Sequence, residues 1–232
     1  MCKQVLLIIS LFMATIFQVG CSSQGFNRGE LKEQIGIVKP AFDDKDIKAA
    51  YNKKSNLPKP FKLAVYFKSP SRANRSSVNW RWSPEDKALV EQACKELVAD
   101  KIVSDVIPII SSLVQDESLR SLRLIAAKHQ ADALLIVTGA GQIDRYTNNW
   151  GWSYLLLAPT LFVKGSQADT LFISSASLWD VKNEYLYITA EAEAVTSDRY
   201  IAAFGKEDKE LIDEAKTQSL QNLKSEFRKM VL

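Results

Sequence analysis

The chain has 232 residues, of which 47% are hydrophobic, so it is long and apolar enough for one domain with a substantial core and a tail. Its 30 basic and 27 acidic residues are interspersed and leave a net charge of only +3. This composition excludes the strongly basic face of a nucleic-acid-binding domain and an acidic tail, so we expect no nucleic-acid partner.

The first 20 residues have the features of a secretory signal peptide. Lys3 supplies a positive charge, and residues 5–17 form an apolar run that only Ser10 and Thr15 interrupt. An apolar core of roughly 7–15 residues between a basic start and small residues is typical of such a signal and is too short to span a bilayer.

The sequence QVGC at positions 18–21 resembles the lipobox of bacterial lipoproteins, although Gln18 stands where that pattern prefers an aliphatic residue. The resemblance implies that Cys21 becomes the first mature residue and carries acyl chains, palmitate among them, so that the membrane is a partner. Ser22 is not the aspartate that retains Gram-negative lipoproteins in the inner membrane, so the resemblance implies an outer-membrane anchor with the domain facing the periplasm. The alternative is an ordinary cleaved signal that contains a cysteine.

Cysteine use follows from this interpretation. Cys2 leaves with the signal and Cys21 is consumed by acylation, so Cys94 stands alone and no intramolecular disulfide is expected. Cys94 falls on the apolar face of a predicted helix, where a small buried thiol is the usual explanation.

The mature chain divides into two parts. Residues 21–60 contain scattered Gly, Pro, Lys and Asp with one helix candidate near residues 44–52, and we expect a lipid-anchored tether. Residues 61–232 are expected to form a single domain. If the tether is disordered, its r.m.s. reach is on the order of 35 Å.

The domain begins with alternating strands and helices. Residues 62–69 are rich in β-branched and aromatic side chains and predict a strand. Residues 102–110 predict a second one, in which Pro108 indicates an edge position or an early end. Ser83 followed by Pro84 and two acids predicts a helix start. Asp116 is expected to cap a second helix that runs to about residue 130.

The second half predicts an antiparallel run. Residues 133–137 are continuously apolar, which indicates a strand covered on both faces at the middle of the sheet. Residues 155–163 predict another strand, residues 169–181 and 185–195 a hairpin around Lys182 and Asn183, and residues 206–232 a long amphipathic helix. The fold class is therefore α/β (α+β), with a mixed sheet of about five or six strands and helices packed on it.

Two stretches carry a resemblance to a known group. ADALLIVTGAGQIDRY at 131–146 and LFISSASLWDVKNEYLYITAEAEA at 171–194 resemble the rhombotarget lipoprotein group, and the element order is similar to the α/β domains of CsgG and the N-terminal domain of TolB. Some members of the group carry a C-terminal glycine-glycine sorting segment with a membrane span, whereas this sequence reads LKSEFRKMVL there. The resemblance therefore implies no rhomboid-type processing, and it supplies no catalytic residues.

The sequence shows no established catalytic or cofactor motif. The sequence has a single histidine, His129, and no closely spaced pair of cysteines, so it lacks the ligand pattern of a zinc site. No acidic loop has the ligand spacing of a calcium site. Gly139 and Gly141 begin a dinucleotide fingerprint, but Asp144 stands where its third glycine belongs, so glycines at a strand end that mark a bulge or a close approach are the better interpretation. We expect no metal, no cofactor and no catalytic residue; an enzyme would need carboxylates to converge, namely Asp144, Asp180, Glu191 and Glu193.

Aromatic residues are the candidate binding residues. Trp80 and Trp82 form one Trp-x-Trp element and Trp150 and Trp152 another, with Tyr146 beside the second. Residues two apart in an extended chain share a side, so each element can present a flat apolar pair that suits protein interfaces, sugar stacking or lipid headgroups. The interpretation that we favour is that these rings simply roof the core at the end of the sheet.

The functional expectation is a lipid-anchored envelope protein that works as a non-catalytic binding or scaffolding subunit with an envelope protein partner. One alternative is a glycan- or peptidoglycan-binding module that uses the tryptophan pairs, and the other is an envelope enzyme with an unrecognised carboxylate site. The sequence does not fix the partner, the process, the membrane leaflet or the oligomeric state; the CsgG-like resemblance makes a homo-oligomer worth testing.

Overall fold

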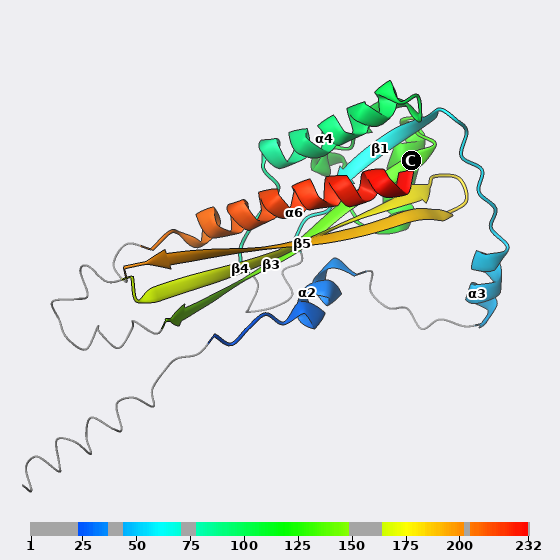
Figure 1. Cartoon of the computed structure of the whole chain (residues 1–232). Coiled ribbons are helices and arrows are strands. Elements are labelled where there is room, and N and C mark those ends of the chain that lie inside the picture. The colour runs from blue at the N-terminus through cyan, green and yellow to red at the C-terminus, as the bar shows by residue number, and fades with distance from the viewer. Residues whose placement is uncertain (1–22, 37–43, 71–77, 149–163, 202–204, 232) are drawn as a thin grey trace, which may run out of the picture.

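A computed structural model describes residues 23–36, 44–70, 78–148, 164–201 and 205–231 (Figure 1). In chain order the elements are α2 (Arg28–Ile35), α3 (Asp44–Tyr51), β1 (Phe61–Phe67), α4 (Pro84–Ala99), β2 (Val103–Pro108), the short 3-10 helix η1 (Ser111–Leu113), α5 (Leu119–Lys128), β3 (Ala133–Thr147), β4 (Ser166–Asp180), β5 (Leu186–Tyr200) and α6 (Asp208–Val231).

The strands of the described residues form one mixed sheet in the order β2–β1–β3–β4–β5. β1 pairs in parallel with β2 and β3, and the long strands β3, β4 and β5 pair antiparallel. The predicted α/β class with a mixed sheet is confirmed. So are the central position of residues 133–137 and the edge position of the strand that contains Pro108; the strand expected at residues 155–163 lies outside the described residues.

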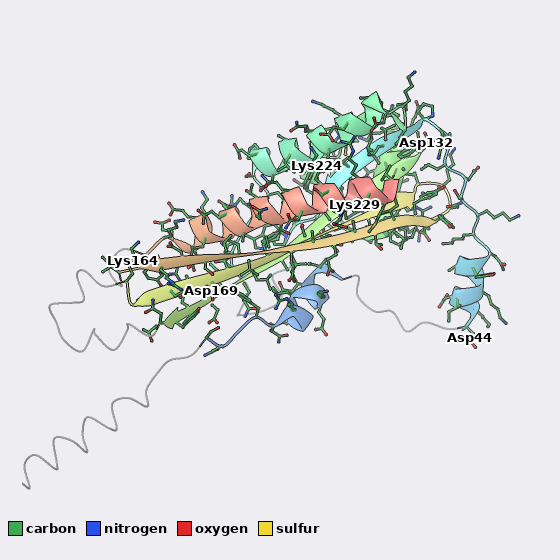
Figure 2. All side chains as sticks on the ribbon, in the orientation of Figure 1. Asp44, Asp132, Lys164, Asp169, Lys224 and Lys229 are labelled. Atoms are coloured by element: carbon green, nitrogen blue, oxygen red, sulfur yellow. The ribbon has the colours of Figure 1, made fainter. Side chains whose placement is uncertain are left out.

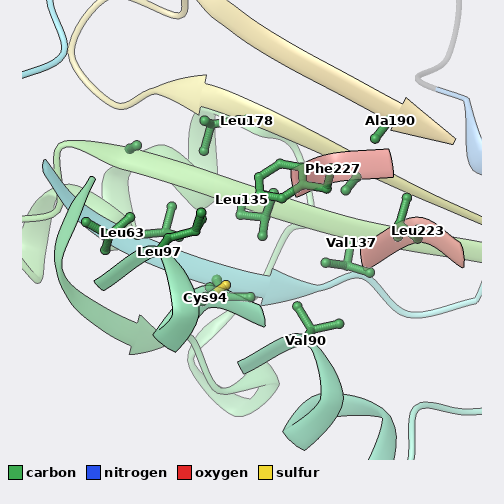
Figure 3. Close-up of a cluster of buried hydrophobic side chains, with 14 of the residues drawn as sticks. Leu63, Val90, Cys94, Leu97, Leu135, Val137, Leu178, Ala190, Leu223 and Phe227 are labelled. Atoms are coloured by element: carbon green, nitrogen blue, oxygen red, sulfur yellow. The ribbon is translucent and has the colours of Figure 1, made fainter. Parts of the chain in front are cut away.

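One face of the sheet is covered by α4 and α6, which lie on the same side in Figure 1. Figure 3 shows how Cys94 and Leu97 of α4 and Leu223 of α6 meet the strand residues Leu63 and Leu135 in this layer. The helical spacing of apolar residues on α4 and α6 therefore buries one face of each helix, as the sequence predicts.

The other face is covered by two shorter helices. Leu122 and Ala126 of α5 pack on the first half of β3 and on β1, whereas Leu31 of α2 packs on the later part of β3 and on β4. α2 thus occupies sheet surface that no element of the domain proper covers within the described residues.

Helix starts follow capping chemistry. Ser83 accepts a hydrogen bond from the Asp86 amide while Asp86 accepts one from the Ser83 amide, which is a complete capping box at the predicted start of α4. The prediction that Asp116 caps the second helix is wrong. Ser118 caps α5, and Asp116 instead accepts hydrogen bonds from the amide and hydroxyl of Ser118.

The glycine pair does not mark a strand end. β3 continues unbroken through Gly139 and Gly141 to Thr147. Both glycines face the side chain of Phe172 on β4. A Cβ at Gly141 would lie 2.5 Å from Ile212 Cδ1 on α6, so close packing across the sheet face, rather than a turn, requires glycine here.

The hairpin between β4 and β5 forms where the sequence predicts it. The residue with positive φ is Glu184 (φ 62°) rather than Asn183. Asn183 instead accepts a hydrogen bond from the Tyr185 amide, and the carboxylate of Asp180 accepts hydrogen bonds from the Lys182 and Asn183 amides. Polar side chains bonded to the backbone therefore hold this turn.

Candidate functional site

The described N-terminal segment is docked on the domain and is not a free tether. We call residues 23–35 the strap. The hydroxyl of Ser23 donates a hydrogen bond to Asp144 Oδ2 over 2.6 Å, and the Gly25 amide donates to the same oxygen over 3.0 Å. The Asn27 amide donates to Gln142 Oε1 over 3.1 Å, so alternate residues of the strap bond to side chains of β3 before the strap becomes helical.

The helix of the strap is defined by local sequence chemistry. Asn27 accepts a hydrogen bond from the Glu30 amide and caps α2, and its side-chain amide donates to the Glu30 carboxylate. Leu31 is only 2% exposed and packs on Ala140, Leu171 and Ile173 of the sheet. Phe26 and Ile35 add partly buried contacts to this cluster, so the strap presents one apolar face to β3 and β4.

Charged pairs tie the strap to the edge strand β5. Arg28 Nε lies 3.0 Å from Glu193 Oε2, and Lys32 Nζ lies 2.6 Å from Glu191 Oε1. The hydrogen bond from Arg28, helped by the charges of Arg28 and Lys32, lowers the pKa of Glu193 against a smaller opposing effect of burial. Because these side chains are about half exposed, we expect the pairs to fix the strap's register more than to stabilise the fold.

The strap reaches the sheet at one particular end. Thr147, Ser166 and Tyr200 stand in register there, and we call this the open end of the sheet. Figure 1 shows the segment before α2 running toward the end where the arrows of β3 and β5 finish. The opposite end holds the hairpin after Asp180, which pairs with Ala133. Figure 2 labels Lys164 and Asp169 near the open end and Asp132 near the other.

A polar cluster lies on the strap face near the open end. Asp169 accepts hydrogen bonds from the hydroxyls of Tyr146 (2.7 Å) and Ser197 (2.6 Å) and from the amide of Gln167 (3.0 Å). Partial burial opposes ionisation of Asp169, but the three hydrogen bonds outweigh it, and its pKa lies below the usual range. The hydrogen bond to Asp169 raises the pKa of Tyr146 to about 12, since the phenol donates to a carboxylate.

A second cluster lies on the helix face at the same end. Arg145 donates to Asp208 Oδ1, to the Lys206 carbonyl and to the hydroxyl of Tyr200, and its guanidinium sits 5.6 Å from the centre of the Tyr200 ring. Asn148 donates to the carbonyls of Gly165 and Lys164, which closes the base of the connection between β3 and β4. The open end is therefore held by internal contacts on both faces.

The remainder of the predicted tether is attached at the opposite end. Lys53 pairs with Glu184, and the Asn56 amide donates to the hydroxyl of Tyr187 over 3.0 Å. α3 lies in the sequence between the strap and this second attachment. It carries no buried residue, and its Ile47 and Tyr51 side chains are 62% and 89% exposed. The helix expected near residues 44–52 is confirmed, and its apolar side chains face solvent.

The first tryptophan pair packs into the core. Trp80 is 6% exposed, and its ring meets Trp82 and Phe172 edge-to-face at centroid distances of 4.8 and 4.9 Å. Trp82 donates its indole N–H to the Lys68 carbonyl over 2.8 Å and packs on Phe67. The two rings stand at 83° to each other and cover the core, as the favoured interpretation of this pair predicts, and they do not form a flat exposed pair.

Three predicted site residues cannot be placed in this way. Cys21, Trp150 and Trp152 lie outside the described residues. Tyr146 belongs to β3 and not to a loop, and its hydroxyl is engaged by Asp169. A glycan-binding role would have to rest on Trp150 and Trp152, because the described aromatic candidates make internal contacts.

The four carboxylates named for an enzyme alternative do not come together. Asp144 binds the strap, and Asp180 holds the hairpin turn. Asp144 pairs with Asp169, and the strand from Asp169 to Asp180 spans roughly 36 Å at about 3.3 Å per residue. Glu191 and Glu193 pair with the strap. Among the described residues, no group of three or more His, Cys, Asp or Glu side chains could hold a metal ion. His129 ends α5 as its C-cap residue.

No protein-family model and no curated protein matches the chain. Among solved structures, similarity is found to a PelC dodecamer from Paraburkholderia phytofirmans (15% identity, 74% of this chain and 91% of that one, TM-score 0.29). Lipoprotein GNA1162 from Neisseria meningitidis (8%, 72% and 99%, 0.34) and the hypothetical protein CT253 from Chlamydia trachomatis (9%, 74% and 98%, 0.34) are also similar. Identities and TM-scores of this size assign neither a family nor a function.

The strap is the feature that sequence reasoning missed. Asn27 followed three residues later by Glu30 is a helix-start signal, and Leu31 and Ile35 are spaced for one helical face. Two apolar residues in a short polar segment are a weak signal, because they predict a helix face without showing what it packs on.

Within the described residues, no helix is long and apolar enough to cross a membrane.

Proposed function

We propose that the protein is an outer-membrane lipoprotein, acylated at Cys21, whose domain acts as a non-catalytic binding or scaffolding subunit of the bacterial cell envelope. The observation that carries the proposal is the hydrogen bond from Ser23 to Asp144. It lies two residues after the cysteine of a lipobox-like sequence, and two extended residues reach about 7 Å at most. An acyl group on Cys21 would therefore sit beside the folded domain.

Acylation would make the attachment permanent. Each methylene that enters the bilayer contributes about 0.8 kcal/mol, so several acyl chains hold a protein far more firmly than a single chain does. A domain held in this way suits a subunit that stays at one membrane and presents a surface to soluble or membrane-bound partners.

The role of the acidic residues supports binding over catalysis. Glu191 and Glu193 hold the strap, and Asp180 holds the hairpin turn. The residues that could bind a partner are exposed instead, with Ile47 and Tyr51 on the outer face of α3. An envelope protein partner fits such a surface, because exposed aliphatic and aromatic side chains on a helix are typical anchors of protein interfaces.

The anchor is tested by the intact mass of protein purified from membranes, compared between the wild type and Cys21→Ser. A mature N-terminus at Cys21 with the added mass of acyl chains, and loss of membrane association in Cys21→Ser, is the expected result. An unacylated N-terminus in the wild type would reject the anchored envelope role.

The binding role is tested by crosslinking in intact cells. A photo-crosslinking amino acid replaces Tyr51, and a control replaces Lys95, which is exposed on α4. We expect a reproducible adduct of defined mass at position 51 that is absent at position 95. Two results together would reject the scaffolding role: no adduct at either position, and a monomeric mass by light scattering in detergent. They would show that the protein binds neither a partner nor a second copy of itself.

A further inference from the structure

The strap places the start of the described chain near one end of the sheet. Ser23 and Gly25 bond to Asp144, which lies three residues before the end of β3 at Thr147. At about 3.3 Å per residue this is roughly 10 Å from the open end of the sheet. Acylated Cys21, two residues earlier, is within reach of the same end.

The docked strap also shortens the free chain between the domain and the proposed anchor. Its contacts extend over residues 23–35 and include hydrogen bonds to β3, the buried Leu31 and ion pairs to β5. Because the strap is fixed to the sheet at several points, it moves with the domain, and Ser22 is the joint between the domain and an acylated Cys21. The opposite hairpin is far from the anchor, because the 15-residue strand β4 spans roughly 45 Å.

We propose that the open end of the sheet rests on the phospholipid headgroup surface, so that the sheet stands away from the bilayer and the hairpin at Lys182 is its distal tip. This inference rests on the proposed acylation of Cys21. The occupant follows from the length of chain outside the described residues, since only Ser22 separates an acylated Cys21 from Ser23.

The chemistry of the open end suits headgroups. Exposed basic side chains at Lys164 and Arg199 lie among acidic ones, and the long basic stems can extend along a surface that carries phosphates. A headgroup layer with both phosphates and amines matches this mixture of charges.

The test measures the depth of single probes. The full acylated chain, with Cys94→Ala to remove the other thiol, carries one cysteine in place of Lys164, of Thr147 or of Lys182, all of which are exposed. Each is labelled with a fluorophore and reconstituted into vesicles of phosphatidylethanolamine and phosphatidylglycerol that contain headgroup spin-labelled lipid. Flotation of the vesicles is measured first, and thermal melting checks that each variant is folded.

We expect quenching at positions 164 and 147 to be several-fold stronger than at position 182. Equal quenching at all three positions, or stronger quenching at 182, in protein that floats with the vesicles would overturn the orientation while the acyl anchor stands. Protein that is folded but does not float would reject the acylation itself, and the orientation with it. Two probes at the open end guard against a local effect of either substitution.

Discussion

The ammonium group of Lys216 on α6 lies 2.9 Å from the carboxylate of Asp86 on α4, and both side chains are almost completely buried. Lys216 also donates to the Arg81 carbonyl and to Asp213, so one cation joins α6, the start of α4 and the segment that carries the first tryptophan pair. Asp86 closes the capping box of α4 at the same time. The layer of helices over the sheet is thus organised around one buried pair.

Removal of the cation tests this arrangement. Lys216→Met keeps most of the side-chain volume but leaves Asp86 buried without its charge partner, which typically costs about 3–5 kcal/mol. Asp213→Asn is the matched control, because the Asp213 side chain is 42% exposed and such a pair is worth about 0–1 kcal/mol. Urea unfolding of both variants measures the difference; equal loss in the two would show that the buried pair has no special weight.

Close packing at Gly141 makes a second prediction. A Cβ there would lie 2.5 Å from Ile212 Cδ1 and 2.9 Å from the ring of Phe172, and both of these side chains are fully buried. We expect Gly141→Ala to cost about 1–3 kcal/mol of unfolding free energy, as overpacked cores do. Gly29→Ala on α2 should be nearly neutral, since its nearest contact is an ordinary 3.5 Å.

The cause can be separated from a simple glycine effect by a double mutant. Ile212→Val removes the Cδ1 atom that the new Cβ would meet. If steric crowding is responsible, Gly141→Ala combined with Ile212→Val will lose less stability than the sum of the two single changes. Strict additivity of the two losses would refute the crowding explanation.

Local sequence signals predicted most of the fold because each acts over a few residues. Ser83 and Pro84 begin α4, the continuous apolar run marks the central strand, and Pro108 marks an edge. The close approach predicted at the glycines of β3 is confirmed, but their place inside the strand was missed because their partners, Phe172 and Ile212, are distant in sequence. A glycine in a strand looks the same in sequence whether it ends the strand or makes room for a neighbouring element.

The candidate site could be predicted only in part for the same reason. The lipobox is a contiguous signal, whereas the strap is defined by partners more than a hundred residues away, such as Asp144 for Ser23. The polar neighbours of Trp80 and Trp82 predict a loop, and the sequence left open whether their rings bind a partner or cover the core. Their burial depends on Phe172 and on α6, which no local pattern reveals.

Docking of the strap depends on Leu31, and this gives a third prediction. Leu31→Asp places a charge against Ala140, Leu171 and Ile173, so the strap should detach while the domain remains folded. Trypsin should then cleave after Arg28 and Lys32 at least tenfold faster than in the wild type, an effect of about 1.4 kcal/mol or more on local opening. Mass spectrometry identifies the cuts and shows whether residues 61–231 stay intact.

The control for this change lies on the same helix. Glu33 is exposed on α2, and Glu33→Ala should leave the cleavage rate close to that of the wild type. Rapid cleavage after Arg28 in the wild type would mean that the strap is not docked in solution, and the orientation inferred above would lose its basis.

Cys94 makes a prediction about alkaline pH. Its thiol is 1% exposed among core side chains, and burial, with a smaller effect from Glu91, raises its pKa to about 12 from an ordinary 9.0. A group whose pKa is raised on folding stabilises the folded state fully below the unfolded pKa and loses that contribution as the pH rises. The contribution of Cys94 should therefore be complete below pH 9.0 and decline between pH 9.0 and about 12.

Two measurements on the Cys21→Ser protein check this. Iodoacetamide at pH 8 should leave Cys94 unmodified in the folded state and modify it after denaturation in urea, because only the thiolate reacts. Chemical denaturation between pH 8 and 10.5 should show a steeper loss of stability than in Cys94→Ala, whose core lacks the thiol. Rapid alkylation of the folded protein at pH 8 would show an accessible, ionised thiol and would reopen a chemical role for Cys94 that its burial between α4, α6 and the sheet argues against.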